Sequence, residues 1–324
     1  MIDKQSISAP PIFIIGVHRS GTTLLRFILS SHPDIYIPPE SDFIPRFFLR
    51  YPNRELTQQQ VEKLLKIIFE KYRFVGEWQG PPPDTNAFYK GLGDKTSAGF
   101  LNALYGMYAQ QNHAVRWGDK TPIYASYVRL IQTIFPKAQF VHMLRDPRDV
   151  AVSILEKYQD REFHVDIYFA ARNWVRRIQK AKQDGHELYP DRYIEIFYED
   201  LVTNPKVTIQ TVCDFLGEPY DPAMLSQNTL AREVIPIDSH FFSNVRQPIT
   251  TARIGRWKQN LTDRDIRLVQ HVCGTLMNEL GYTEVDLGSM GLFEWLRMQL
   301  LHFKYSSLQA GRRFLQVIGL VPPI

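Results

Sequence analysis

The stretch PIFIIGVHRSGTTLLRFILSSHP, residues 11–33, decides the fold of this chain. It opens with an apolar run, passes through a glycine-bounded turn from Gly16 to Thr23, and returns at once to an apolar segment that starts at Leu24. This pattern predicts a strand, a tight loop and a helix. Backbone N–H groups at the start of such a helix point at one spot, and the helix dipole favours negative charge there. The stretch therefore predicts a strand-loop-helix unit that binds an anion.

The loop has the G-x-x-x-x-G spacing of a nucleotide-phosphate loop but lacks its lysine. Thr22 stands where an ATP-binding loop carries lysine. Arg19 adds a full positive charge, and the hydroxyl groups of Ser20, Thr22 and Thr23 add donors. The ligand should carry less concentrated charge than ATP at its reacting end and need no metal, and a sulfuryl group joined to a 5′-phosphate fits that description. The alternative is a tight turn without a ligand.

Short apolar segments predict the strands of the domain. They cover residues 12–15, 114–117, 139–145 and 192–198, and each is followed by a turn. Helical patterns lie between them, and strands that alternate with helices predict a parallel sheet covered on both faces. We therefore expect an α/β fold with a doubly wound parallel sheet of the P-loop NTPase-like type. Ligands of such sheets bind beyond the carboxyl ends of the strands.

Helices are predicted in several of the intervening segments. The clearest cover 58–72, 166–184, the stretch from Asn204-Pro205 to Gly217, and the stretch from Thr262 to Gly281, the last two with capping residues at their ends. Residues 52–90, with PPPD at 81–84, are interpreted as a helix followed by an irregular insertion near the mouth of the site.

Composition limits the class of protein. The 324 residues allow one large domain with or without an appendage, and the 44% hydrophobic content is that of a globular chain. A net charge of +4 is mild; it predicts no nucleic-acid partner but suits anionic ligands. Cys213 and Cys273 both lie in apolar, helix-like stretches, so we expect two buried thiols and a reducing compartment. No secretory signal is recognised at the start of the sequence, which makes the cytoplasm the expected location.

A second informative segment is QFVHMLRDPRDVAVSILEKY, residues 139–158. A strand delivers Arg145 to its carboxyl end, and a helix follows that carries Ser153 and Lys157 at positions i and i+4, on one face. These three side chains could converge on a second phosphate. The other charged residues of the segment are expected to form local caps and ion pairs: Asp146, Arg148 and Asp149.

The two segments together resemble the phosphate-binding elements of sulfotransferases that use 3′-phosphoadenosine 5′-phosphosulfate (PAPS). The match continues with Tyr198-Glu199-Asp200-Leu201 and with Gly255-Arg256-Trp257-Lys258, in family order over residues 11–281. The resemblance implies a sulfotransferase that moves a sulfuryl group to a hydroxyl acceptor, with PAPS as co-substrate and no metal.

The resemblance also implies roles for single residues. The 5′-phosphosulfate would be held by Arg19, Ser20, Gly21, Thr22 and Thr23. Arg145 and Ser153, with Lys157 as a weaker candidate, would hold the 3′-phosphate, and Tyr198 would stack on the adenine. Arg256 would reach the phosphates from a segment at 241–256 that closes over the co-substrate.

The general base has to be found outside the pattern of the cytosolic small-molecule members. Those enzymes carry a K-T-H run, whereas here Lys120-Thr121 is followed by Pro122. Residues 32–46 resemble the tyrosylprotein-type and related bacterial members, in which a glutamate is the base, and the matching residue is Glu40. Water exclusion is expected to raise the pKa of Glu40 and improve it as a base. The alternative for Glu40 is a surface carboxylate or a helix cap.

Lys120 is expected just beyond a strand, in Gly118-Asp119-Lys120-Thr121. It matches a family lysine that stabilises the transferring sulfuryl group, with Arg19 as a second shield, and Asp119 is expected to orient it; a surface lysine in a turn is the alternative. The letters GDKT also occur at residues 93–96, too short an echo to be a repeat. His18 and His32 are minor candidates for the base, and the histidine spacing predicts no metal site.

The C-terminal segment differs in composition from the rest. Residues 287–324 hold four basic residues against one acid, Glu294, interleaved with large apolar residues. Such a tail predicts an amphipathic helix that docks on its own domain or on a second copy, or one that lies on a membrane surface. We therefore expect a sulfotransferase domain at 1–285 and a basic helical tail at 286–324, and a location that is cytoplasmic or peripheral at a membrane.

The acceptor and two rival functions stay open. The acceptor pocket is expected between residues 40–110 and the helix 166–184, whose Trp174 and neighbours Tyr168 and Phe169 could equally belong to the core. A glycan, a lipid, a peptide or a small molecule with a hydroxyl group are all candidates. The rival functions are a P-loop kinase or nucleotide hydrolase, and a non-catalytic nucleotide-binding protein.

Overall fold

The computed structural model describes residues 9–49, 52–71, 82–158, 165–188, 190–234 and 245–317. At its centre is a parallel sheet of five strands in the order β2-β3-β1-β4-β5. The strands are β1 (Ile12–Gly16), β2 (Ile35–Tyr36), β3 (Arg116–Lys120), β4 (Gln139–Leu144) and β5 (Tyr193–Phe197). In register, Ile14 of β1 lies between Lys120 of β3 and Val141 of β4. All strands run parallel, as an α/β fold with crossover helices requires.

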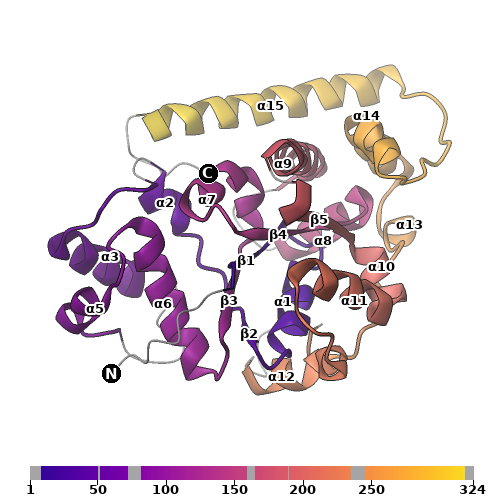
Figure 1. Ribbon diagram of the computed structural model, residues 1–324. Coiled ribbons are helices and arrows are strands. Elements are labelled where there is room, and N and C mark those ends of the chain that lie inside the picture. Colours follow the sequence, from indigo (N-terminus) through magenta and orange to yellow (C-terminus); the bar gives the residue numbers. More distant parts are fainter. Residues whose placement is uncertain are drawn as a thin grey trace.

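Both faces of the sheet are buried under helices (Figure 1). Because side chains alternate along a strand, Ile12 and Ile14 of β1 face one layer and Phe13 and Ile15 face the other. The first layer consists of α1 (Thr22–Ser30), α10 (Tyr198–Thr203), α11 (Pro205–Leu216) and, beyond them, α12 (Gln227–Val234). The second contains the 3₁₀ helix η1 (Pro122–Ser126), α7 (Val128–Ile134), α8 (Pro147–Tyr158) and α9 (Ile167–Leu188). The predicted doubly wound α/β fold is confirmed.

A group of helices beside β3 extends the core away from the sheet (Figure 1). It comprises α2 (Ile44–Phe48), α3 (Gln58–Lys71), α5 (Thr85–Gly91) and α6 (Ser97–Gln111). Val61 and Ile68 of α3 and Phe88 of α5 share one hydrophobic cluster with Phe13 of β1. The insertion at 52–90 is therefore part of the main core. Its second helix, capped by Asp84, was not predicted, and the segment 72–81 lies outside the described residues.

Several boundaries differ from the prediction for physical reasons. The strand expected at 114–117 begins at Arg116 and ends at Lys120, because the polar side chains of Asp119 and Lys120 are buried with partners and do not form a turn. The strand β2 has two residues and gave no periodicity to recognise. Asn204 stands at the start of α11 as expected, but its side chain makes no capping hydrogen bond. Thr262 does cap its helix, through the backbone N–H of Asp265.

The last part of the chain packs on the second helical layer. Short α13 (Trp257–Asn260) leads to α14 (Asp263–Glu279), and α15 (Leu292–Val317) lies across α9 and α14 (Figure 1). Met298 and Tyr305 of α15 are buried in the cluster formed with α9 and α14. The tail is thus a helix with one face docked on its own domain. No helix in the described ranges combines the length and the apolar character that crossing a bilayer requires.

The two cysteines are buried and unpaired, as predicted. Cys213 lies in α11 and Cys273 in α14, each in a hydrophobic cluster on one side of the sheet.

Candidate active site

The loop after β1 is shaped by two residues with positive φ. Arg19 has φ +73° and Gly21 has φ +92°. A Cβ atom on Gly21 would lie 2.5 Å from Cδ2 of Tyr198, so only glycine allows the tyrosine ring to pack against the loop. The Ser20 hydroxyl donates to the Val17 carbonyl oxygen at 2.7 Å, which closes the turn. The loop then enters α1 at Thr22, where backbone N–H groups are directed at the space above the loop.

A cavity of about 290 Å³ opens beside this loop at the carboxyl ends of β1 and β4. Seven of the predicted binding residues line it, from three separate parts of the chain. They are Arg19, Gly21, Thr22, Thr23, Arg145, Ser153 and Tyr198. The position agrees with the rule that ligands of parallel sheets bind at the carboxyl ends of the strands.

Direct hydrogen bonds join the two predicted phosphate-binding segments. Nε of Arg19 donates to Oγ of Ser153 at 2.8 Å, and Nη1 of Arg145 donates to the carbonyl oxygen of Arg19 at 2.9 Å. The guanidinium of Arg145 also lies 4.2 Å from the centroid of the Tyr198 ring. The loop and the tip of β4 therefore face one ligand-sized space together.

This wall of the cavity is cationic. Burial lowers the pKa of Arg19, and the neighbouring charges of Arg145 and Arg253 lower it further. An anion bound between these guanidinium groups would offset both effects. Nε of Arg19 points to Ser153, beside the Arg145 guanidinium, and its predicted role as a second shield of the sulfuryl group stays a prediction.

Three predicted residues do not line the cavity. Ser20 is buried in the turn, and the charge of Lys157 acts on His18 and Glu40, whose pKa values it lowers. Arg256 forms an ion pair with Glu156 at 2.5 Å. Arg253, three residues earlier, lines the cavity in its place. Sequence reasoning missed Arg253 because the G-R-W-K motif directs attention to the arginine inside it.

The segment 245–253 forms another part of the cavity lining. It contributes apolar and polar groups that the sequence did not single out, among them Gln247, Ile249 and Thr250. The predicted closing segment at 241–256 is thus in place from residue 245 onward, whereas 241–244 lie outside the described residues.

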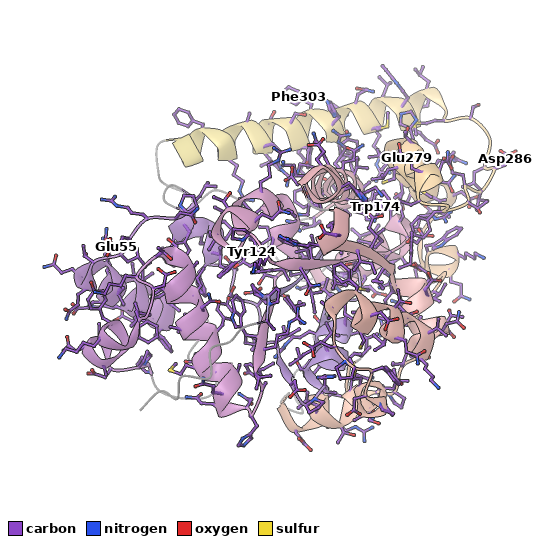
Figure 2. All side chains as sticks on the ribbon, in the orientation of Figure 1. Glu55, Tyr124, Trp174, Glu279, Asp286 and Phe303 are labelled. Carbon is purple, nitrogen blue, oxygen red and sulfur yellow. The ribbon has the colours of Figure 1, made fainter. Side chains whose placement is uncertain are left out.

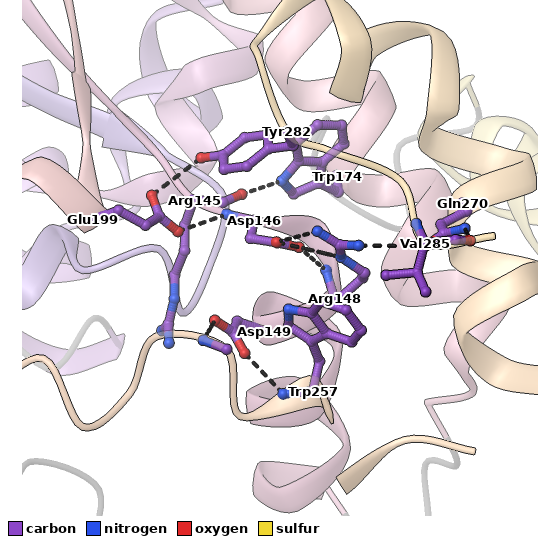
Figure 3. A network of polar contacts seen from close by, with 11 residues as sticks. Arg145, Asp146, Arg148, Asp149, Trp174, Glu199, Trp257, Gln270, Tyr282 and Val285 are labelled. Atoms are coloured by element: carbon purple, nitrogen blue, oxygen red, sulfur yellow. Dashed lines mark hydrogen bonds and ion pairs between the residues drawn. The ribbon is translucent and has the colours of Figure 1, made fainter. Parts of the chain in front are cut away.

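Asp149 holds the end of this segment (Figure 3). Its carboxylate accepts hydrogen bonds from the backbone N–H groups of Gly255 at 2.7 Å and Trp257 at 3.0 Å. Nη2 of Arg145 donates to the carbonyl oxygen of Arg253 at 2.7 Å. Asp149 was expected to form only a local cap, so this bridge over more than a hundred residues of sequence is a correction.

The rest of the R-D-P-R-D run behaves as expected (Figure 3). Asp146 pairs with Arg148 at 2.7 Å, and the guanidinium of Arg148 lies 3.9 Å from the Trp257 ring centroid. Behind the run, Glu199 accepts from the backbone N–H of Asp146 at 3.1 Å, and the indole N–H of Trp174 donates to the carbonyl oxygen of Arg145 at 2.9 Å. These contacts fix the backbone that carries Arg145.

Two of the three predicted catalytic residues, Glu40 and Lys120, form an ion pair next to the loop. Nζ of Lys120 lies 2.6 Å from Oε1 of Glu40 and donates to Oγ1 of Thr23 at 3.2 Å. Lys120 ends β3, the strand beside β1, and Glu40 lies in the segment after β2. The Lys120 side chain is buried, whereas that of Glu40 is 41% exposed. The arrangement joins a cation, a carboxylate with access to solvent and a hydroxyl at the start of α1.

The pKa of Glu40 is opposite to the prediction. Burial acts to raise it, but the charges of Lys120 and His18 and the hydrogen bond from Lys120 outweigh burial and lower the pKa from 4.5 to about 2. The expectation of a raised pKa is therefore wrong for the ion-paired state. Burial also lowers the pKa of Lys120, and Glu40 opposes that shift.

Asp119 does not orient Lys120, because adjacent residues of a strand point to opposite faces of the sheet. Its carboxylate accepts hydrogen bonds from Ser41 Oγ at 2.6 Å and from the hydroxyl of Tyr105. The backbone N–H of Ser41 donates to Oγ1 of Thr121 at 3.1 Å. Asp119 and Thr121 therefore hold Ser41, the residue next to Glu40, and do not contact the lysine side chain through a hydrogen bond that the structure shows.

The two histidine candidates have other environments. Burial, followed by the charge of Arg177, lowers the pKa of His18 to about 3, which makes its imidazole a weak base. His32 belongs to the group His32, Asp34 and Glu218, whose ligand atoms lie within 4.8 Å of one another in the described part of the chain. Both ring nitrogens of His32 already contact backbone groups, those of Asp34 and Pro219, and Glu218 is paired with Arg116.

The aromatic residues of α9 belong to the core. Tyr168 and Trp174 are buried, and Phe169 packs edge-on against Tyr305 of α15. Of the two roles considered for these side chains, acceptor pocket or core, the core role is confirmed.

Comparison with known proteins places this geometry in a family. The family model described as "Sulfotransferase family" matches residues 10–222. A putative protein-tyrosine sulfotransferase of Caenorhabditis briggsae is 26% identical over 84% of this chain and 88% of its own length, and a protein-tyrosine sulfotransferase of Drosophila melanogaster is 25% identical over 84% of this chain but only 52% of its own length. Among solved structures, the sulfotransferase domain of the Synechococcus PCC 7002 olefin synthase aligns with a TM-score of 0.53 and 25% identity, over 81% of this chain and 94% of that domain. The chain belongs to the sulfotransferase family.

Proposed function

We propose that this sulfotransferase takes its sulfuryl group from 3′-phosphoadenosine 5′-phosphosulfate and transfers it in line to a hydroxyl group, with Glu40 as the general base. The observation that carries the proposal is the junction of two separate donor clusters in one cavity, where Arg19 reaches Ser153 at 2.8 Å. A ligand with anionic groups at two ends of one nucleoside fits such a cavity.

The donor would occupy the cavity between the loop and the segment 245–253. Its 5′-phosphosulfate would meet the start of α1, where Thr22 and Thr23 add hydroxyl donors to the backbone N–H groups. Its 3′-phosphate would meet the guanidinium groups of Arg145 and Arg253 and the Ser153 hydroxyl. The part of the Tyr198 ring that lines the cavity would serve the adenine.

The transfer step needs a base, a cation and a fixed path. The acceptor oxygen forms a bond to sulfur while the bond from sulfur to the 5′-phosphate oxygen breaks, and the hydroxyl proton passes to a carboxylate oxygen of Glu40. The ammonium group of Lys120 neutralises the charge that develops on the departing phosphate oxygen. Thr23, which contacts Lys120 at 3.2 Å, ties the lysine to the start of α1, where the phosphosulfate would lie.

The low pKa of Glu40 is compatible with this role if Lys120 changes partner. A carboxylate with a pKa of about 2 is a poor base at neutral pH. When the ammonium group turns from Glu40 to the bound phosphosulfate, its charge no longer offsets the effect of burial on Glu40, and the pKa of Glu40 rises. The ion pair would thus keep the base weak until the donor has bound.

The acceptor is proposed only as a class. Relatives carry the name protein-tyrosine sulfotransferase, so a tyrosine hydroxyl in a peptide is the first acceptor to test, beside glycan, lipid and small phenolic hydroxyl groups. A screen of these classes with labelled PAPS identifies the substrate by the product that carries the label.

The variant Glu40→Gln tests the assignment of the base. We expect turnover to fall by about 10²-fold, because a general base of this kind contributes about that factor. The affinity for 3′-phosphoadenosine 5′-phosphate, measured by calorimetry, should stay within about twofold, since Glu40 lies outside the donor cavity. Glu62→Gln, a change on the exposed side of α3, is the matched control.

Two results would contradict the proposal. Unchanged turnover in Glu40→Gln removes Glu40 as the base while leaving the donor assignment intact. Wild-type protein that binds ATP with magnesium more tightly than 3′-phosphoadenosine 5′-phosphate removes PAPS as the donor.

A further inference from the structure

The outward face of α15 carries an apolar stripe from Phe293 to Phe303. Large side chains recur at alternating spacings of three and four residues, at Phe293, Leu296, Leu300 and Phe303, and the same spacing reaches Phe314. Phe293 is 84% exposed, Leu300 71% and Phe303 73%. Figure 2 shows Phe303 pointing away from the body of the molecule. A patch of this size on one helix exceeds the scattered apolar residues of an ordinary surface.

The inward face of the same helix is already satisfied. Met298 and Tyr305 are buried against α9 and α14, and the Tyr168 hydroxyl lies 2.7 Å from Nδ1 of His302. Ion pairs add to this contact, between Glu294 and Arg267 at 2.7 Å and between Lys304 and Asp166 at 3.1 Å. Rotating the helix to bury the apolar stripe would break these contacts, so the packing of α15 keeps the stripe on the outside.

The charges of α15 favour an anionic partner. The helix carries Arg297, Lys304, Arg312 and Arg313 against the single acid Glu294, and Glu294 is held inward by Arg267. The charged residues of α15 that flank the stripe, Arg297 and Lys304, are basic, and each is ion-paired with an acid of the domain, Asp265 at 3.5 Å and Asp166 at 3.1 Å. The four basic residues still outnumber these two acids and Glu294, so this side of the molecule keeps a net positive charge. An apolar stripe of Phe and Leu with basic flanks is the pattern of a helix that lies in the plane of a membrane surface.

The same flanks argue against a second copy of this chain. Helices that pair through such a stripe use flanking positions of opposite charge, whereas here the positions beside the stripe are Arg297, Gln299, Lys304, Ser306 and Arg313. A second copy would offer no acidic residue at these positions to pair with the basic ones, and Ser307 and Ala310 interrupt the apolar seam. An anionic lipid surface meets both the apolar and the charged parts of the helix.

We propose that α15 docks this protein on an anionic membrane surface, with the stripe from Phe293 to Phe303 in the boundary between headgroups and acyl chains. The helix has 26 residues, and a straight helix of that length extends about 39 Å, so it meets the surface lengthwise. Because ion pairs and buried side chains fasten α15 to α9 and α14, docking the helix docks the whole domain. The protein would then be peripheral at the membrane.

Co-sedimentation of the full chain with vesicles tests this proposal. Vesicles of phosphatidylglycerol and phosphatidylcholine should bind the protein, and pure phosphatidylcholine should bind it at least about tenfold more weakly. Binding should weaken as sodium chloride screens the basic flanks. Equal binding to both kinds of vesicle, or binding to neither, overturns the proposal.

A triple variant locates the binding to the stripe. Phe293→Ser, Leu300→Ser and Phe303→Ser together should lower the affinity for the anionic vesicles by at least about tenfold, since three large apolar groups lose their burial. The matched control carries Val115→Ser and Val207→Ser, two exposed apolar residues on other elements, and should bind within about twofold of the wild type. An unchanged circular dichroism spectrum and melting temperature show that the triple variant is folded.

Sedimentation velocity separates the competing occupant. A wild-type dimer that becomes a monomer in the triple variant, without vesicle binding by either protein, assigns the stripe to a second copy and overturns the membrane proposal. A wild-type monomer that binds anionic vesicles supports it.

Discussion

The letters GDKT occur twice in this chain, and the two copies lie in different structural environments. At Gly93–Thr96 the side chain of Asp94 accepts hydrogen bonds from the backbone and hydroxyl of Thr96 at 2.9 and 2.7 Å, in an exposed turn that caps α6. At Gly118–Thr121 the same letters cover the last three residues of strand β3 and the residue after it, and all four residues are buried. Four identical residues therefore build a surface cap in one place and part of the candidate active site in the other.

The lysines show the contrast most clearly. Lys95 is exposed and lies 4.9 Å from the ring centroid of Tyr89. Lys120 is buried and lies 2.6 Å from the Glu40 carboxylate. The difference comes from the preceding residues, because apolar residues before Gly118 place it in a strand, whereas Gly93 follows the end of a short helix. The pair provides an internal control for each role assigned to β3.

The largest expected effect separates the two lysines. Lys120→Ala should lower kcat/KM by about 10²–10³-fold, the usual loss when one preorganised donor to a developing negative charge is removed. Lys95→Ala should leave kcat/KM within about twofold, as expected for a surface change. Steady-state sulfuryl transfer from PAPS to an accepted hydroxyl compound measures both.

An equal loss in the two lysine variants would break the comparison and remove Lys120 from the transfer step. A loss in Lys120→Ala that is matched by weaker binding of 3′-phosphoadenosine 5′-phosphate would place the lysine in donor binding instead.

The fold could be predicted from the sequence because its signals are local. The apolar run before Gly16, the loop and the helix at Thr22 appear where they were expected, as do β4, β5 and α11. The two-residue strand β2 was not predicted, and the end of β3 was placed too early, because Asp119 and Lys120 look like turn residues until their partners are known. Those partners, Glu40 and Ser41, lie about 80 residues away in sequence, and no local pattern announces such a contact.

The sequence predicted which residues belong to the candidate site better than it predicted their pKa values and their partners. Family motifs indicated Arg19, Arg145 and Ser153, which meet in the cavity. The low pKa of Glu40 was missed because it depends on a 2.6 Å contact whose strength outweighs burial. The sequence did not predict that Arg253 lines the cavity and Arg256 does not, because Arg256 forms an ion pair with Glu156 that no local pattern indicates.

The two aspartates of the repeated letters should differ in their effect on stability. Asp119→Ala should lower the free energy of unfolding by about 2–4 kcal/mol, because the buried hydroxyl groups of Ser41 and Tyr105 both lose an acceptor. Asp94→Ala should cost only about 0.5–1 kcal/mol, since it removes two exposed hydrogen bonds that support the cap residue Thr96. Urea denaturation at neutral pH measures both values, and equal costs would contradict the role given to Asp119.

The smallest effect concerns the pH dependence of the ion pair between Lys120 and Glu40. The pKa of Glu40 is about 2 in the folded protein and 4.5 when unperturbed, so the unfolded state binds the proton first as the pH falls. The contribution of Glu40 to stability is therefore complete above pH 4.5 and is lost between pH 4.5 and pH 2. It should stay below about 1 kcal/mol, because the Glu40 side chain is 41% exposed and solvent screens the pair.

The repeated letters supply the control for this measurement as well. Urea denaturation across that pH range should show a shallower loss of stability in Lys120→Ala than in the wild type, because without the ammonium group the pKa of Glu40 returns toward its unperturbed value. Lys95→Ala should follow the wild-type curve, since Lys95 contacts the Tyr89 ring and lies in a different turn. Parallel curves for Lys120→Ala and the wild type would mean that the close contact with Glu40 does not persist in solution, and the weak-base state proposed for Glu40 would then have no physical cause.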